Sequence, residues 1–162
     1  MSGVPRWKRF RDSGRIEPAD LLSAFGIAGP PIDVLAIAQG LDVEVAAASE
    51  PGWSGALRSD EEKATIWVRR EDDPMRKRFT IAHELGHLML HPLGQEWRDN
   101  PAFKGGAKER EANQFASKLL VPIGMLHTAI QRAGRAQEEA LAQEFMVSLR
   151  MMRRRLDEWD NL

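Results

Sequence analysis

The order of apolar and polar positions divides the first part of the chain into short helices and strands. Helical spacing, ended by glycine or proline, predicts helices within residues 18–27 and 31–41. Alternation of apolar and polar residues predicts strands within 41–48, 53–59 and 63–70. A short charged turn, SDEEK, is all that separates the last two strands. Strands joined so closely predict a small, mostly antiparallel, three-stranded sheet.

The second half of the chain is predicted to be helical. Asp73 is a good N-cap and Pro74 suits the first helical position, so a helix is expected to begin here and to run to His91. Residues 92–106 contain two prolines and three glycines and are predicted to form a loop. Further helices are predicted at 107–121, 123–134 and 136–158, the last as one bent helix or two short ones. A small sheet packed on such a helical bundle is an α+β fold.

One domain is expected for most of the 162 residues, from 18 to 162, with 136–158 as its C-terminal helices. Residues 1–17 are polar and basic and are interpreted as an N-terminal arm. The formal net charge of -1 argues against a protein whose whole surface is basic and binds nucleic acid. Since no stretch has the length of a membrane span or the apolar centre of a signal peptide, we expect a cytoplasmic protein without a membrane partner.

The chemistry is concentrated in the predicted helix that ends at His91. It contains His83-Glu84-Leu85-Gly86-His87, the HExxH pattern, inside an otherwise apolar run. Positions i and i+4 share one face of a helix, so His83 and His87 can both reach a single zinc ion. Glu84 is then placed to take a proton from the attacking water. The alternative is a pair of core histidines that hydrogen-bond to the backbone.

A third metal ligand is expected from the next helix, because a catalytic zinc site has three protein ligands and the chain has no cysteine. Glu109 lies at the edge of that helix's apolar stripe and is the preferred candidate, with Glu111 as its substitute. Asn113 follows Glu109 by one turn and is expected to hydrogen-bond a ligating histidine or carboxylate. His91 ends its own helix and is not expected to reach the same ion.

A substrate peptide is expected to pair with the third predicted strand, which is interpreted as a sheet edge. The backbone groups assigned to this contact are those of Thr65, Ile66, Trp67 and Val68.

The C-terminal helices admit two interpretations. Four arginines give them local positive charge, as in the reading helix of a helix-turn-helix: Arg150, Arg153, Arg154 and Arg155. The apolar stripe of Leu149, Met152 and Leu156 instead favours packing, on the zinc helix or against a repressor.

Three stretches resemble the ImmA/IrrE family of zinc-dependent metallopeptidases over about residues 30–158: FTIAHELGHLMLH, EREANQFASKLLVP and LAQEFMVSLRMMRRRL. The resemblance implies a zincin-like, more narrowly gluzincin-like, fold. It also implies that His83, His87 and Glu109 hold Zn²⁺, with Glu84 as general base. Where more distant gluzincins have an aspartate, this chain has Asn113.

The same resemblance implies a partner. The expected substrate is a helix-turn-helix transcriptional repressor encoded nearby, whose cleavage would relieve repression of stress, phage or mobile-element genes. The alternative is a toxin or regulatory binding module of a toxin–antitoxin-like pair, which binds a repressor, an antitoxin or DNA with little proteolysis.

Overall fold

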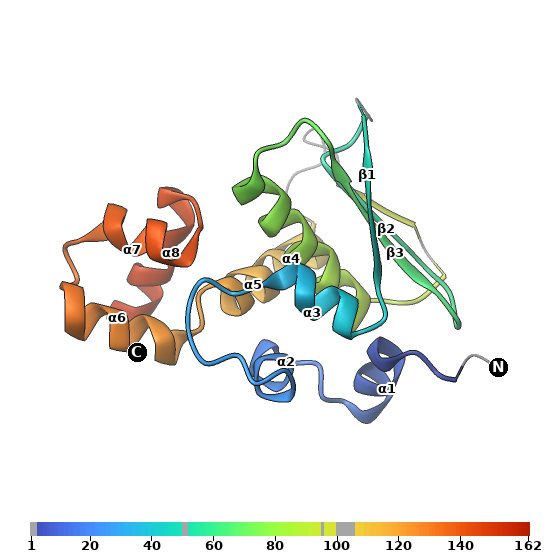
Figure 1. The fold of residues 1–162 in the computed structure, drawn as a ribbon, viewed down its shortest axis with the longest axis horizontal. Coiled ribbons are helices and arrows are strands. Elements are labelled where there is room, and N and C mark those ends of the chain that lie inside the picture. The colour runs from blue at the N-terminus through green and yellow to red at the C-terminus, as the bar shows by residue number, and fades with distance from the viewer. Residues whose placement is uncertain (1–2, 50–51, 95, 100–105) are drawn as a thin grey trace.

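The computed structural model describes residues 3–49, 52–94, 96–99 and 106–162, and these form a mixed sheet with helices on one side of it (Figure 1). The elements are α1 (Arg6–Ser13), α2 (Pro18–Ala24), α3 (Val34–Gly40), β1 (Glu44–Ala48), β2 (Gly55–Ser59), β3 (Ala64–Arg69), α4 (Pro74–Leu90), β4 (Glu96–Asp99), α5 (Ala107–Leu120), α6 (Ile123–Ala133), α7 (Glu138–Phe145) and α8 (Leu149–Asp160). The α+β class is confirmed. Every helix in the described residues is too short or too polar to cross a lipid bilayer.

The sheet has the strand order β1-β3-β2-β4. β3 pairs with β1 in parallel and with β2 antiparallel, and β2 pairs antiparallel with β4. All three predicted strands form. The prediction of a loop throughout 92–106 is wrong at residues 96–99, which form β4, and its residues 95 and 100–105 lie outside the described part of the chain. A four-residue strand held by pairing with β2 leaves little trace in local sequence.

β3 lies inside the sheet, so the expectation that it is an edge is wrong. Ile66, for example, pairs with Val45 on one side and with Leu57 on the other. The backbone groups of 65–68 are therefore used within the sheet, and a substrate strand cannot add to Thr65, Ile66, Trp67 or Val68. Periodicity reveals a strand but not its neighbours, which is why the sequence misplaced it.

α4 is the central helix, in contact with β2 and β3 on one side and with α5 on another. Its start agrees with the prediction: Asp73 Oδ1 accepts a hydrogen bond of 2.8 Å from Arg76 N, and Pro74 is the first helical residue. Every residue from Thr80 to Met89 is buried. Leu85 and Leu88 join Leu57 and Ile66 of the sheet in the main hydrophobic core.

α1 packs on this core, so residues 6–13 of the predicted N-terminal arm are part of the folded domain. The Trp7 side chain is fully buried, and Trp7 N donates a hydrogen bond of 2.9 Å to Leu41 O. Arg11 Nη1 donates to Leu88 O at 2.7 Å and to His91 O at 2.6 Å, at the end of α4. The basic composition of residues 1–17 gave no sign that the Trp7 side chain is buried.

The C-terminal helices α6, α7 and α8 form a lobe near the N-terminal end of α4 that is far from the sheet (Figure 1). Arg78 of α4 joins this lobe to the segment before α3 by hydrogen bonds. Its guanidinium donates to Ile32 O at 2.5 Å, and also to Phe145 O and Met146 O. Burial lowers the pKa of Arg78 from its ordinary value.

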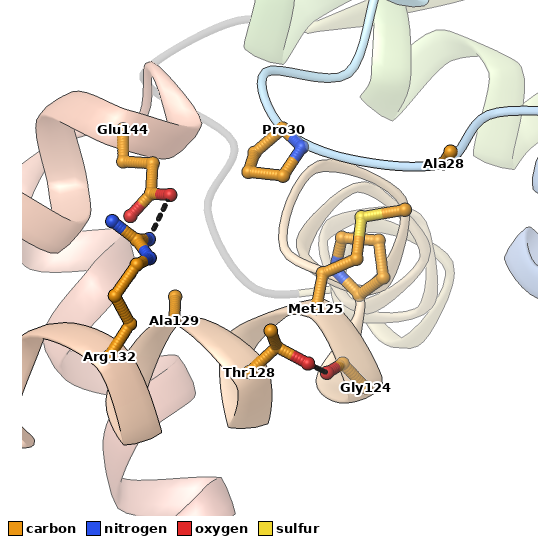
Figure 2. A pocket seen from close by; sticks show the side chains of 9 residues that line it. Ala28, Pro30, Gly124, Met125, Thr128, Ala129, Arg132 and Glu144 are labelled. Carbon is orange, nitrogen blue, oxygen red and sulfur yellow. Dashed lines mark hydrogen bonds and ion pairs between the residues drawn. The ribbon is translucent and has the colours of Figure 1, made fainter.

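A cavity of about 500 Å³ lies between α6 and the segment that contains Ala28 and Pro30. Figure 2 shows the ion pair of Arg132 and Glu144 on one side of it and Met125 on another. None of the histidines of α4 lines this cavity.

The close approach of α4 and α5 depends on Gly86. A Cβ at this position would lie 3.0 Å from Phe115 Cβ and 3.1 Å from Ala112 Cα. The second of these atoms is backbone, so it cannot rotate away, and any side chain at position 86 would push the two helices apart.

The substitution Gly86→Ala is expected to lower the free energy of unfolding by about 1–3 kcal/mol, because the added methyl overpacks the α4–α5 contact. Gly124→Ala is the control, since a Cβ there meets nothing within 4 Å. It should be neutral or raise stability by up to about 1 kcal/mol through helix propensity. Chemical unfolding of both variants measures the difference. Equal stability of the two would contradict the role assigned to Gly86.

Candidate metal centre

α4 places two imidazoles one turn apart on the face directed at α5. His83 and His87 are 3% and 0% exposed, and their ring centroids are 4.8 Å apart. The i, i+4 spacing of the HExxH pattern brings them together, as predicted. Burying two such rings is costly unless their nitrogen atoms have partners.

Glu109 of α5 reaches both rings. Its Oε1 lies 2.9 Å from His87 Nε2, and its Oε2 lies 3.1 Å from His83 Nε2. The ligand atoms of the three residues all lie within 4.8 Å of one another. The side chain of Glu109 is 29% exposed, so solvent has access to the cluster from this side. The structure thus brings together the three residues that the sequence nominated as ligands.

The donor set fits a divalent cation. Two imidazole nitrogens and one carboxylate are the protein ligands of many catalytic zinc sites, which leave a fourth position open. Zinc bonds of 2.0–2.2 Å in tetrahedral geometry separate neighbouring ligand atoms by about 3.3 Å. The contacts of 2.9 and 3.1 Å between the Glu109 oxygens and the two Nε2 atoms are close to this separation.

Asn113 determines which nitrogen of His83 faces the cluster. Its Oδ1 lies 2.8 Å from His83 Nδ1. Since an amide oxygen only accepts hydrogen bonds, Nδ1 carries the hydrogen and Nε2 keeps its lone pair for a metal. Asn113 thus occupies the supporting position predicted for it, one turn after Glu109.

A second supporting contact, which the sequence analysis missed, lies behind His87. Its Nδ1 is 2.7 Å from Nδ1 of His91, and His91 Nε2 is 3.4 Å from Glu111 Oε2. Neither His91 nor Glu111 belongs to the cluster of three ligand atoms. Burial, and then the neighbouring His87, lower the pKa of His91. The available signal was the repeated i, i+4 spacing, which continues from 83 and 87 to 91.

Glu84 is fully buried on α4, beside β2. A Cβ at Gly55 of β2 would lie 2.4 Å from Thr80 Cγ2 and 3.6 Å from Glu84 Oε1. Only glycine therefore allows β2 to approach the helix this closely. The sequence analysis did not identify Gly55, because a lone glycine in a strand has many causes.

The C-terminal arginines lie in the lobe, not at the cluster. Arg155 is buried, and its Nε donates to Val121 O at 2.9 Å. Arg150, Arg153 and Arg154 are exposed, and Arg153 forms an ion pair with Glu138. α8 makes its main contacts with α7, and Met152 and Leu156 of the predicted apolar stripe are buried in the core.

A buried HExxH helix, a carboxylate from the following helix and an adjacent small sheet define the class of HExxH metallopeptidases. The family model described as Peptidase M78, IrrE N-terminal-like domain, matches residues 38–157. The chain therefore belongs to this peptidase family, which confirms the resemblance to the ImmA/IrrE proteins. A comparison with curated proteins gave no match. α1 and α2 lie before the matched segment.

Asn113→Leu is expected to weaken metal binding by about 10–100-fold, because His83 loses the acceptor that orients it. Asn113→Asp keeps an oxygen at this position and should remain close to the wild type. Competition with a chromophoric chelator measures the affinity for zinc.

Gln114→Leu is the matched control, because Gln114 is exposed on the same helix. Its affinity should equal that of the wild type. An Asn113→Leu variant that binds zinc as tightly as this control would exclude the supporting role.

Proposed function

We propose that this protein is a zinc-dependent metalloendopeptidase. The observation that carries the proposal is the convergence of His83 Nε2, His87 Nε2 and the Glu109 carboxylate next to buried Glu84. Among common divalent ions, zinc suits this mixed nitrogen and oxygen set with one open position. Membership of a peptidase family supports peptide hydrolysis as the reaction.

The residues divide the chemistry between them. His83, His87 and Glu109 would hold the ion, which when bound supplies Lewis acidity toward the substrate carbonyl and the attacking water. Glu84 takes a proton from that water as it attacks, and then delivers it to the leaving amine. Asn113 keeps His83 in the orientation that ligation requires.

β4 is the better place for an extended substrate. Among the described strands, it is at the sheet edge and pairs only with β2. β2 in turn contacts α4 and approaches Glu84 at Gly55. A peptide added along β4 by backbone hydrogen bonds would lie nearer to Glu84 than one added at the other edge, β1. This replaces the contact first assigned to 65–68.

The proposed substrate is a helix-turn-helix repressor encoded nearby, and the support for it is membership of the family that the ImmA/IrrE proteins define. Cleavage of such a repressor would activate the genes that it silences. Stable binding of an antitoxin or repressor without cleavage is the alternative within the same family.

DNA binding by the C-terminal lobe is a second candidate. α7 and α8 are joined by a short turn in which Met146 has a left-handed backbone, and Ser148 caps α8. This is the connection of a helix-turn-helix. Arg150 and Arg154 are exposed on α8, but Asp157 shares its exposed surface.

Glu84→Gln is expected to bind zinc with unchanged affinity and to cleave at least about 100-fold more slowly, because it lacks the general base. The assay incubates purified protein with the product of the adjacent repressor gene and follows fragments by mass spectrometry. Chelation should stop wild-type cleavage, and added zinc should restore it. Glu139→Gln, on the exposed surface of α7, should cleave normally.

A Glu84→Gln variant that cleaves at the wild-type rate would refute the assigned base. A wild type that binds the repressor tightly but leaves it intact would favour the binding module.

For the DNA-binding candidate, the double substitution Arg150→Ala and Arg154→Ala should abolish a mobility shift with operator DNA and reduce its salt dependence. Arg135→Ala is the control, because Arg135 pairs with Asp160 and Glu138 within the lobe. A shift that survives the double substitution, or no shift for the wild type, would exclude α8 as a DNA reader.

A further inference from the structure

His91 is not one of the three clustered ligand residues, yet it is 3% exposed and its ring contacts one of them. The two Nδ1 atoms of His87 and His91 are 2.7 Å apart, and the ring centroids are 4.9 Å apart. At this distance one nitrogen must donate a hydrogen and the other must accept it. The direction of this hydrogen bond decides whether His87 can bind a metal.

Glu111 determines the direction. Its Oε2 lies 3.4 Å from Nε2 of His91, and a carboxylate oxygen only accepts, so the His91 hydrogen is on Nε2. A neutral imidazole has one N–H, which leaves His91 Nδ1 as an acceptor. His87 Nδ1 must then be the donor, so His87 Nε2, which lies 2.9 Å from Glu109 Oε1, is the ring nitrogen left to bind an ion. The opposite direction would place a hydrogen on Nε2, where it would block ligation.

His91 is also held by its backbone. It is the C-cap of α4, with φ -117° and ψ 165°, and its N–H donates to His87 O at 3.0 Å. Its carbonyl accepts a hydrogen bond of 2.6 Å from Arg11 Nη1. Arg11 Nη1 also donates a hydrogen bond to Leu88 O. Arg11 therefore fixes the place where the chain leaves the helix, and with it the position of the imidazole.

We propose that His91 is a positioning residue for His87, held by Glu111 through its ring and by Arg11 through its backbone. Both metal-facing imidazoles would then be oriented by an acceptor behind them: His83 by Asn113 and His87 by His91. The inference rests on the proposed metal centre but not on peptide hydrolysis, so metal binding alone can test it.

The experiment uses the full chain loaded with Co²⁺, whose visible absorption reports coordination geometry, and zinc affinity from chelator competition. His91→Leu removes the acceptor. His91→Asn places a side-chain oxygen near the position of the lost Nδ1. We expect about 10–100-fold weaker zinc binding and an altered Co²⁺ spectrum for His91→Leu. His91→Asn should recover most of the affinity and the wild-type spectrum.

Thermal unfolding of the metal-free variants separates positioning from stability. If His91 had only a structural role, both variants would be less stable than the wild type, and the Co²⁺ spectrum of each would be unchanged. His127→Leu is the matched control, because His127 is exposed on α6, and it should bind metal like the wild type. If His91→Leu fails to fold, the variants Glu111→Ala and Arg11→Met test the inference instead. Each is expected to lower the affinity for zinc several-fold.

Each of three results would overturn the inference. The first is a zinc affinity of His91→Leu within about twofold of the wild type, with the same Co²⁺ spectrum. The others are equal zinc affinities of His91→Leu and His91→Asn, or wild-type zinc affinity in both Glu111→Ala and Arg11→Met. A wild type that binds neither Co²⁺ nor zinc would overturn the metal centre itself. Tight metal binding without any cleavage would refute only the peptidase proposal.

Discussion

The contact between α4 and α5 is the constraint on which the site depends. Ten successive residues of α4 are buried, and this run includes two imidazoles and a carboxylate. Such groups are tolerated inside a protein only when neighbouring polar atoms meet them. α5 comes close enough to do this because position 86 has no side chain and position 112 has only a methyl. The packing of α4 against α5 therefore also assembles the site.

α5 supplies a polar partner for each of the histidines at positions 83, 87 and 91 in turn. Glu109 contacts the Nε2 atoms of His83 and His87, Asn113 contacts His83 from behind, and Glu111 reaches His91. The short segment EREAN thus meets three rings that span two helical turns. A rotation of α5 about its axis would disrupt all of these contacts together. This explains how a helix with exposed polar flanks can specify one arrangement.

The parts that the sequence predicted are those decided within one helix. The spacing of His83 and His87, the Asp73 cap and the apolar stripe that turns Glu109 inward are all local patterns, and the structure has each of them. The parts that it missed depend on contacts between distant segments. β3 became central because β1 and β2 pair on its two sides, and β4 exists only through β2. Trp7 is buried by α1 docking, which a basic composition conceals.

The guanidinium of Arg11 at the C-terminal end of α4 has a consequence for which residues the site needs. The segment that defines the family starts at residue 38, and it contains every proposed ligand and the proposed base. Arg11 and Trp7 precede it. A fragment trimmed to that segment would retain the whole reactive signature but lose the clamp on the last turn of its central helix. The segment matched by the family model and the segment that supports the last turn of α4 are thus not the same length of chain.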